Sequence, residues 1–214
     1  MSPKRKLNSD TCSRSNGSRC YNRPTVFSNS FQMVTTNHQL WHLVSENARK
    51  MLDDPRLLPD DLRGRHFEPT LHLWVSPTFT PEKHWIYSLP RPNLQPKPKP
   101  IVQQIVWQRE IDLQRIMAAE LDPQIEISLD FFIDTETTEI ELDIYRRMRD
   151  KLGSCKLAPF LEHDSVGRDG DLMGIETLDI FYAGRITWWS DPPEEWSEII
   201  DWFESQVKFF DSVF

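Results

Sequence analysis

SDPPEEWSEIIDWFESQVKFFDSVF, residues 190–214, is the stretch with the most definite structural pattern. Asp191 can cap a helix, Pro192 suits its first turn, and Glu194 stands three residues after the cap. Large apolar residues then recur with helical spacing at Trp196, Ile199, Ile200, Phe203, Val207 and Phe210. Burying such a stripe removes large side chains from water, at roughly 1.5–3 kcal/mol each. The pattern therefore predicts a helix that packs its apolar face against a sheet.

Alternating residues upstream predict the strands of that sheet. Leu71, Leu73 and Val75 point one way in an extended chain, while His72 and Trp74 point the other way. This alternation is typical of a half-buried strand, and HWIYSL shortly after it predicts a hairpin partner. The further segments predicted to be extended are residues 101–107, 124–134, 178–182 and 185–189.

Helical patterns separate these strands. Residues 37–53 carry apolar residues at helical spacing, with His38 and His42 on an exposed side, and residues 108–121 favour a helix through the Ala118–Ala119 pair. A further helix over residues 139–152 has Gly153 as its stop. Together these elements predict an α+β fold, with a single mixed or antiparallel sheet of about five strands and helices packed mainly on one face.

The domain organisation follows from changes in composition. Residues 1–33 are rich in Ser, Arg and Asn and are predicted to be a disordered basic tail. Residues 34–214 are predicted to form a single domain, built from a helix-hairpin part (34–89) and a sheet-helix part (101–214). Five prolines in residues 90–100 predict a stiff, extended connector that crosses between these two parts.

Composition argues against several function classes. The chain has only seven glycines and contains neither GxxxxGK[ST] nor GxGxxG, so no cofactor is predicted. The three cysteines form no disulfide framework and no CxxC pair, and no metal site is predicted. No apolar run approaches the roughly 18 residues of a membrane span, and the basic N-terminal segment lacks an apolar signal core, so the expected compartment is the cytoplasm.

Charge is unevenly distributed along the chain. Residues 1–32 contain six basic residues and one acidic residue, a net of +5, so the remainder of the chain carries −8 − 5 = −13. An acidic body repels a phosphate backbone, so nucleic acid binding is not expected except through the tail. The same charge favours another protein as the partner, and a basic one in particular.

FFIDTETTEIELD, residues 131–143, raises the question of a catalytic site. Asp134 and Glu136 are two apart, so in a strand they point to the same face, where two carboxylates can hold Mg²⁺. Residues 131–138 resemble the first motif of the DEDD-type 3′–5′ exonucleases, an apolar strand that ends in Asp-x-Glu-Thr-Thr-Gly. The resemblance implies metal-dependent phosphodiester cleavage at Asp134 and Glu136.

The same stretch departs from that family and also fits a structural account. Glu139 replaces the family's glycine, and His163 and Asp169 are six apart where the family spaces its last pair by five. Thr138 and Glu141 have the spacing of a capping box at the start of the helix predicted for residues 139–152.

These observations leave two functions open. The first is a non-catalytic, acidic, protein-binding module (an adaptor, inhibitor or immunity-type partner), with Trp189, Trp202 and Phe209 as candidate partner-binding anchors. The alternative is a metal-dependent phosphodiesterase or exonuclease that uses Asp134 and Glu136.

Overall fold

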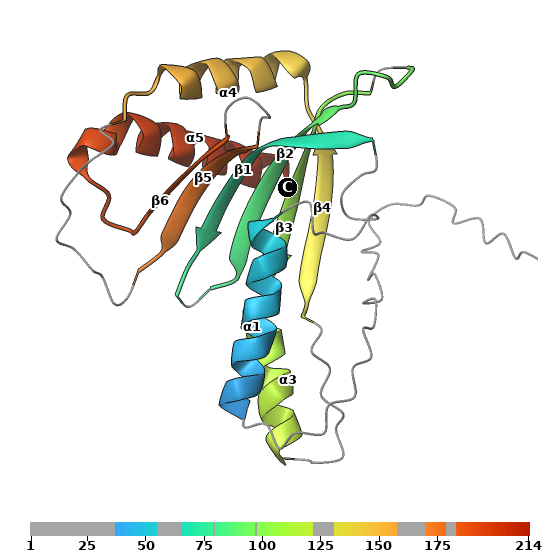
Figure 1. Ribbon diagram of the computed structural model, residues 1–214, viewed down its shortest axis with the longest axis vertical. Helices are drawn as coiled ribbons and strands as arrows, with labels where there is room; N and C mark the ends of the chain where they lie inside the picture. Colours follow the sequence, from blue (N-terminus) through green and yellow to red (C-terminus); the bar gives the residue numbers. More distant parts are fainter. Residues whose placement is uncertain are drawn as a thin grey trace, which may run out of the picture. The chain divides into compact units, whose positions relative to one another are not determined.

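The computed structural model describes residues 37–54, 66–78, 80–96, 98–121, 131–157, 170–178 and 183–214. All of them belong to one compact unit, Met33–Phe214 (Figure 1). Its helices are α1 (Asn37–Asp53), α3 (Arg109–Leu121), α4 (Leu142–Ser154), the short η2 (Glu194–Trp196) and α5 (Ser197–Val213). Its strands are β1 (Phe67–Ser76), β2 (Glu82–Pro90), β3 (Ile101–Trp107), β4 (Ile133–Glu139), β5 (Leu172–Leu178) and β6 (Ala183–Trp188).

The strands form one antiparallel sheet of six strands in the order β4-β3-β2-β1-β5-β6. This confirms the α+β class and the single sheet. The predicted hairpin is also confirmed, and β1 and β2 lie in the middle of the sheet. The proline-rich connector joins β2 to its neighbour β3, so it is the loop of a hairpin and not a crossing between two halves.

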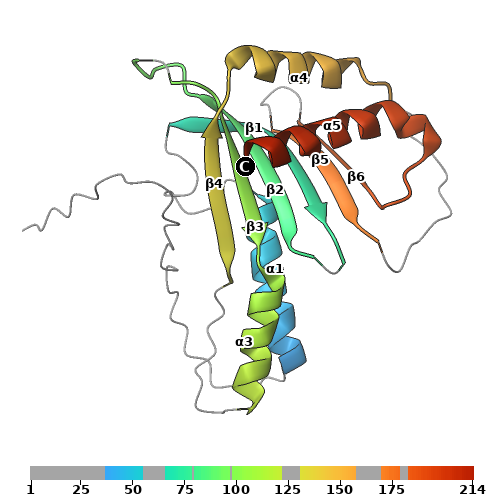
Figure 2. The same cartoon turned by 180° about the vertical axis from the view of Figure 1, so that it is seen from behind.

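One face of the sheet is covered by α4 and α5 (Figure 2). The stripe predicted for the last helix is buried there, with Phe203 and Phe210 against aromatic side chains of the sheet. Trp85 stacks on Phe210 with ring centroids 5.8 Å apart, and Trp188 meets Phe203 edge-on at 5.0 Å. Aromatic pairs of this kind add to the free energy gained by burial.

The opposite face carries α1, which begins and ends where the sequence predicts (Figure 1). Ala48 and Leu52 of α1 pack on Ile86, Ile105 and Trp107. The second layer buries the other side of β1 as well, so the central strands are buried on both faces and not on one.

A buried carboxylate fixes α3 to the end of the sheet. Asp112 Oδ2 accepts hydrogen bonds from Trp107 Nε1 at 2.8 Å and from the backbone N–H of Phe132 at 3.1 Å. The strand-then-helix prediction for residues 101–121 is confirmed, and Asp112 links that helix to the start of β4.

Three boundaries differ from the predictions. The last helix, α5, starts only at Ser197 with Trp196 at its N-cap position, so the predicted cap at Asp191 is wrong. Thr138 pairs with Val102 in the β3–β4 ladder, so β4 runs on to Glu139 and α4 starts only at Leu142. Glu141 occupies the N-cap position without a side-chain capping bond, so the predicted capping box is wrong. β5 begins at Leu172, well before the extended segment predicted for residues 178–182. The predicted extended segments 124–130 and 179–182 lie outside the described residues.

Gly174, the glycine of β5, should tolerate no larger residue, because it faces Trp74 across the β1–β5 ladder. A Cβ atom at Gly174 would overlap the indole ring of buried Trp74. We expect Gly174→Ala to lower the free energy of unfolding by about 1–3 kcal/mol, measured by urea denaturation. Gly184→Ala is the matched control, since its Cβ would meet only Thr177 Oγ1, at 3.7 Å. Equal stability of the two variants would contradict this packing.

Candidate functional site

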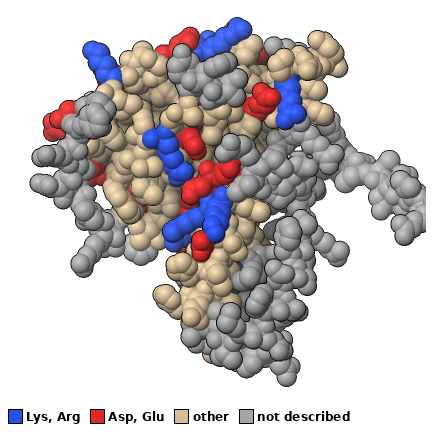
Figure 3. All heavy atoms as spheres, in the orientation of Figure 1, with Lys and Arg blue, Asp and Glu red and all other residues tan. Residues whose placement is uncertain are grey.

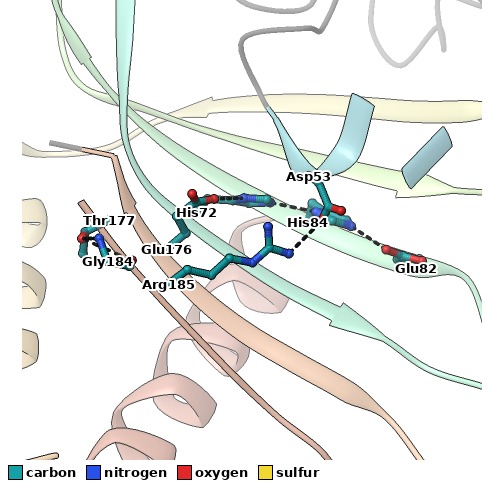
Figure 4. Close-up of polar contacts among 8 residues, drawn as sticks. All are labelled: Asp53, His72, Glu82, His84, Glu176, Thr177, Gly184 and Arg185. Carbon is teal, nitrogen blue, oxygen red and sulfur yellow. Dashed lines mark hydrogen bonds and ion pairs between the residues drawn. The ribbon is translucent and has the colours of Figure 1, made fainter. Parts of the chain in front are cut away.

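Four titratable side chains form a continuous buried chain under α1 (Figure 4). Glu82 Oε1 lies 2.9 Å from His84 Nε2, and His84 Nδ1 lies 2.8 Å from His72 Nε2. His72 Nδ1 then lies 3.6 Å from Glu176 Oε2. Both histidines are fully buried, Glu82 nearly so, and Glu176 is partly buried. We call these four residues the His–Glu chain.

Strand register explains why the four side chains meet. Glu82 and His84 are two apart in β2 and share a face. His72 in β1 pairs directly with Ile86, so His84 is its diagonal neighbour, within reach of an imidazole ring. Glu176 in β5 stands directly opposite His72 on the other side. The chain therefore crosses three adjacent strands.

Hydrogen-bond chemistry assigns the protons along the His–Glu chain. An ionised carboxylate only accepts, so His84 Nε2 donates to Glu82, and in a neutral imidazole the other ring nitrogen, here His84 Nδ1, then accepts. His72 Nε2 therefore donates to His84, which leaves a bare lone pair on His72 Nδ1 facing the carboxylate of Glu176. Two acceptors face each other at that junction, which accounts for its 3.6 Å separation and for the absence of a hydrogen bond to either atom among the described residues.

Burial governs the charge states in this chain. Burial lowers the pKa of His72 to about 4, although the neighbouring Glu176 opposes that change. Burial alone would raise the pKa of Glu82, but hydrogen bonds from His84 and Ser76 and the charge of Arg49 hold it below its ordinary value. At neutral pH the chain thus contains an ionised Glu82 and a neutral His72.

Arg185 in β6 continues this polar layer toward the edge of the sheet. It lies opposite Glu176 in the ladder, and its guanidinium covers the ring of Trp74 at 4.5 Å. Arg185 also donates to Asp53 at the end of α1, with 2.8 Å between Nη2 and Oδ1 (Figure 4). This exposed ion pair and the cation–π contact connect the helix to the sheet edge.

The His–Glu chain is suited to controlling stability. Two surface hollows in the described part of the molecule are lined by other residues. A buried network whose polar atoms are only partly paired is sensitive to protonation and to mutation.

Asp134 and Glu136 lie elsewhere, on the exposed edge strand β4. They point to the same side, as the strand prediction requires, and Gln108 Nε2 donates to Asp134 Oδ2 at 2.7 Å. His163 and Asp169 lie outside the described residues. Among the described residues there is no group of three or more His, Cys, Asp or Glu side chains that could hold a metal ion. Two-metal cleavage requires a larger ligand cluster than Asp134 and Glu136 alone.

The three candidate anchors for a partner occupy different environments. Trp189 is 42% exposed, directly after β6. Phe209 is half-buried beside Phe210, with ring centroids 5.6 Å apart. Trp202 is fully buried, and its Nε1 donates to the carbonyl oxygen of Met148 at 3.2 Å. The expectation that Trp202 lies outside the core is therefore wrong, because α5 packs on α4 as well as on the sheet.

Comparisons with protein-family models, with curated proteins and with solved structures find no match to this chain. In the part of the chain that the structure describes, no helix is long and apolar enough to cross a membrane.

The sequence did not reveal the His–Glu chain, because the alternation in β1 predicted that one face of this strand is exposed to solvent. The available signal was polar residues at same-face positions, with His72 beside Trp74 in one strand and Glu82 before His84 in the next. Glu176 could not be added without the register of β5, which was predicted to start later.

Acid should destabilise the protein through His72. The folded pKa of about 4 lies below the ordinary value of 6.5, so the unfolded chain binds a proton first as the pH falls. Linkage then gives a loss of about 3 kcal/mol in the free energy of unfolding between pH 6.5 and 4. We expect urea denaturation to show a shallower pH slope in His72→Gln than in wild type. His42→Gln, at an exposed site on α1, should retain the wild-type slope, and a shared slope in all three proteins would contradict this role.

Trp202 should contribute to stability as a core residue. We expect Trp202→Ala to lower the free energy of unfolding by about 3–5 kcal/mol, because it opens a cavity between α4 and α5. Trp189→Ala, at the exposed site, should change it by no more than about 0.5 kcal/mol. Thermal melts of the two variants test this difference, and a similar melting temperature for both would show that the indole of Trp202 adds little to the core.

Proposed function

We propose that this protein is a non-catalytic binding module that recognises a basic partner protein through the exposed face of α3. The observation that carries the proposal is a row of apolar side chains at Leu113, Met117 and Leu121. They are 41%, 55% and 88% exposed, and their spacing of four residues places them along one side of the helix. We call these three residues the α3 stripe.

The composition of α3 supports an intermolecular role for this stripe. The opposite side of the helix is already buried, through Asp112, Ile116 and Ala119. A helix that is apolar on both sides is typical of one that is covered on both sides. α3 also extends past the ends of the strands (Figures 1 and 2), so the sheet does not cover its outer side.

The net negative charge of the chain supports a basic protein as the partner. The sequence from residue 33 onward has a net charge of −13, which attracts cationic surfaces at long range and repels anionic ones. Apolar anchors then supply short-range affinity, as in interfaces where a few large side chains dominate the binding energy. Trp189, with Asp191, Glu194 and Glu195 close behind it in the sequence, remains a candidate second anchor.

A cross-linking experiment tests the proposal. A photo-cross-linking amino acid in place of exposed Gln114 lies next to Leu113 and leaves all three residues of the α3 stripe unchanged. We expect it to capture a basic protein in cells, and the purified partner to bind the wild-type chain with a Kd that rises with salt. Leu113→Gln/Met117→Gln should weaken that binding by about tenfold or more, since two buried side chains are lost from the interface.

The matched control removes two exposed apolar side chains from other elements. Leu157→Gln/Val213→Gln should leave the Kd unchanged, because these positions lie away from α3. If the stripe variant instead melts far below wild type, the stripe is covered within the chain itself and the proposal fails. Concentration-dependent self-association that the stripe variant abolishes would identify a second copy as the occupant, which also contradicts a basic partner.

A further inference from the structure

A groove of about 370 Å³ is lined by residues along one side of α1 and by Arg109 at the start of α3. Its size falls within the roughly 300–1,000 Å³ of small-molecule sites. Figure 3 shows Lys and Arg side chains next to Asp and Glu side chains in the middle of this view. The groove lies apart from the α3 stripe, none of whose residues line it.

The acidic groups of the groove are already paired. Glu46 binds Lys50 at 2.8 Å, and Asp53 binds Arg185 at 2.8 Å. Two guanidinium groups, those of Arg49 and Arg109, also line the groove, and no carboxylate of the described residues forms an ion pair with either. The groove therefore has a local excess of positive charge on an acidic protein.

Arg49 and Arg109 both line the groove, and both interact electrostatically with the buried carboxylate of Glu82. Burial lowers the pKa of Arg109 from its ordinary value, the charge of Glu82 opposes this, and the charge of Arg49 lowers it further. Arg109 is held in place by donating to the carbonyl oxygen of Pro77 at 2.9 Å and by lying 5.4 Å over the ring of Trp107. Guanidinium groups stay protonated in proteins, and two of them lining one groove can bind the oxygens of a phosphate.

α1 adds an aromatic and a hydroxyl group in line with Arg49. Trp41, Ser45 and Arg49 are spaced by four residues and all line the groove. One face of Trp41 stacks on Trp107, with ring centroids 6.1 Å apart. Ser45 Oγ is buried and has no hydrogen-bond partner in the described part of the chain, so it can still donate to an incoming oxygen.

We propose that the α1 groove binds an organic phosphate with a flat aromatic ring, of the size of a nucleoside monophosphate. The phosphate binds Arg49 and Arg109, Ser45 donates to a ligand oxygen, and the ring packs against Trp41. Recognition by side chains suits a chain with seven glycines, which has few backbone positions able to surround a phosphate. This inference is independent of the function proposed for the α3 stripe.

Calorimetric titration of the full-length protein with AMP, adenosine and inorganic phosphate tests the inference. We expect AMP to bind at least tenfold more tightly than either adenosine or phosphate, since only AMP engages both the cationic pair and Trp41. AMP should also raise the melting temperature of the wild-type protein. Arg49→Gln should weaken AMP binding by about tenfold or more, as expected for the loss of a hydrogen bond to a charged group.

Arg147→Gln is the charge-matched control, because Arg147 is exposed on α4 on the other side of the sheet. It should bind AMP as wild type does. Equal AMP affinity in Arg49→Gln and Arg147→Gln, or no binding by wild type, overturns the inference. Equal affinity for AMP and inorganic phosphate contradicts packing on Trp41 and overturns it as well. Circular dichroism of both variants verifies that each is folded.

Discussion

The structure depends on burial of the central hairpin, β1 and β2, from both sides. α4 and α5 cover the side that carries Leu71 and Leu73, and α1 covers the side that carries His72 and His84. Once the second layer is in place, the two imidazoles lose their water and must find protein partners. The His–Glu chain is thus a consequence of a three-layer arrangement, and its incomplete pairing makes the layer responsive to acid.

Helices and strands in which apolar residues recur at regular helical or strand spacing were predictable from the sequence. The bounds of α1, the β1–β2 hairpin, the β3–α3 succession, the existence of β6 and the apolar face of the last helix follow from apolar spacing within a short window, whereas the predicted start of the last helix at Asp191 does not match α5, which begins at Ser197. The failures lie where a non-local pairing overrides a local signal. Thr138 and Glu141 have the spacing of a capping box, yet the backbone of Thr138 pairs with Val102 in the β3–β4 ladder. The helix α4 therefore starts only after this pairing ends, at Leu142.

The candidate site was less predictable than the fold, because its geometry is set by register and by layer packing. The apolar stripe predicted for the last helix does not include Trp202. In the structure α5 contacts both the sheet and α4, so the face that α5 buries is wider than that stripe and includes Trp202. His72 and Glu176 lie more than 100 residues apart in sequence, and only the β1–β5 pairing brings them together. The α1 groove likewise needs the docked position of α1 beside Arg109.

The two proposed sites bind partners of opposite charge. This is possible because the two electrostatic interactions act over different distances. The field of an acidic chain acts over many ångströms and is screened beyond about 8 Å at physiological ionic strength. A basic protein approaching the α3 stripe experiences that field, so salt weakens its attraction. A phosphate in the α1 groove binds Arg49 and Arg109 at contact distance, where screening is weak, and salt also reduces its repulsion by the rest of the chain. One acidic protein can therefore attract a cationic partner at long range and still hold a small anion in a local cationic groove.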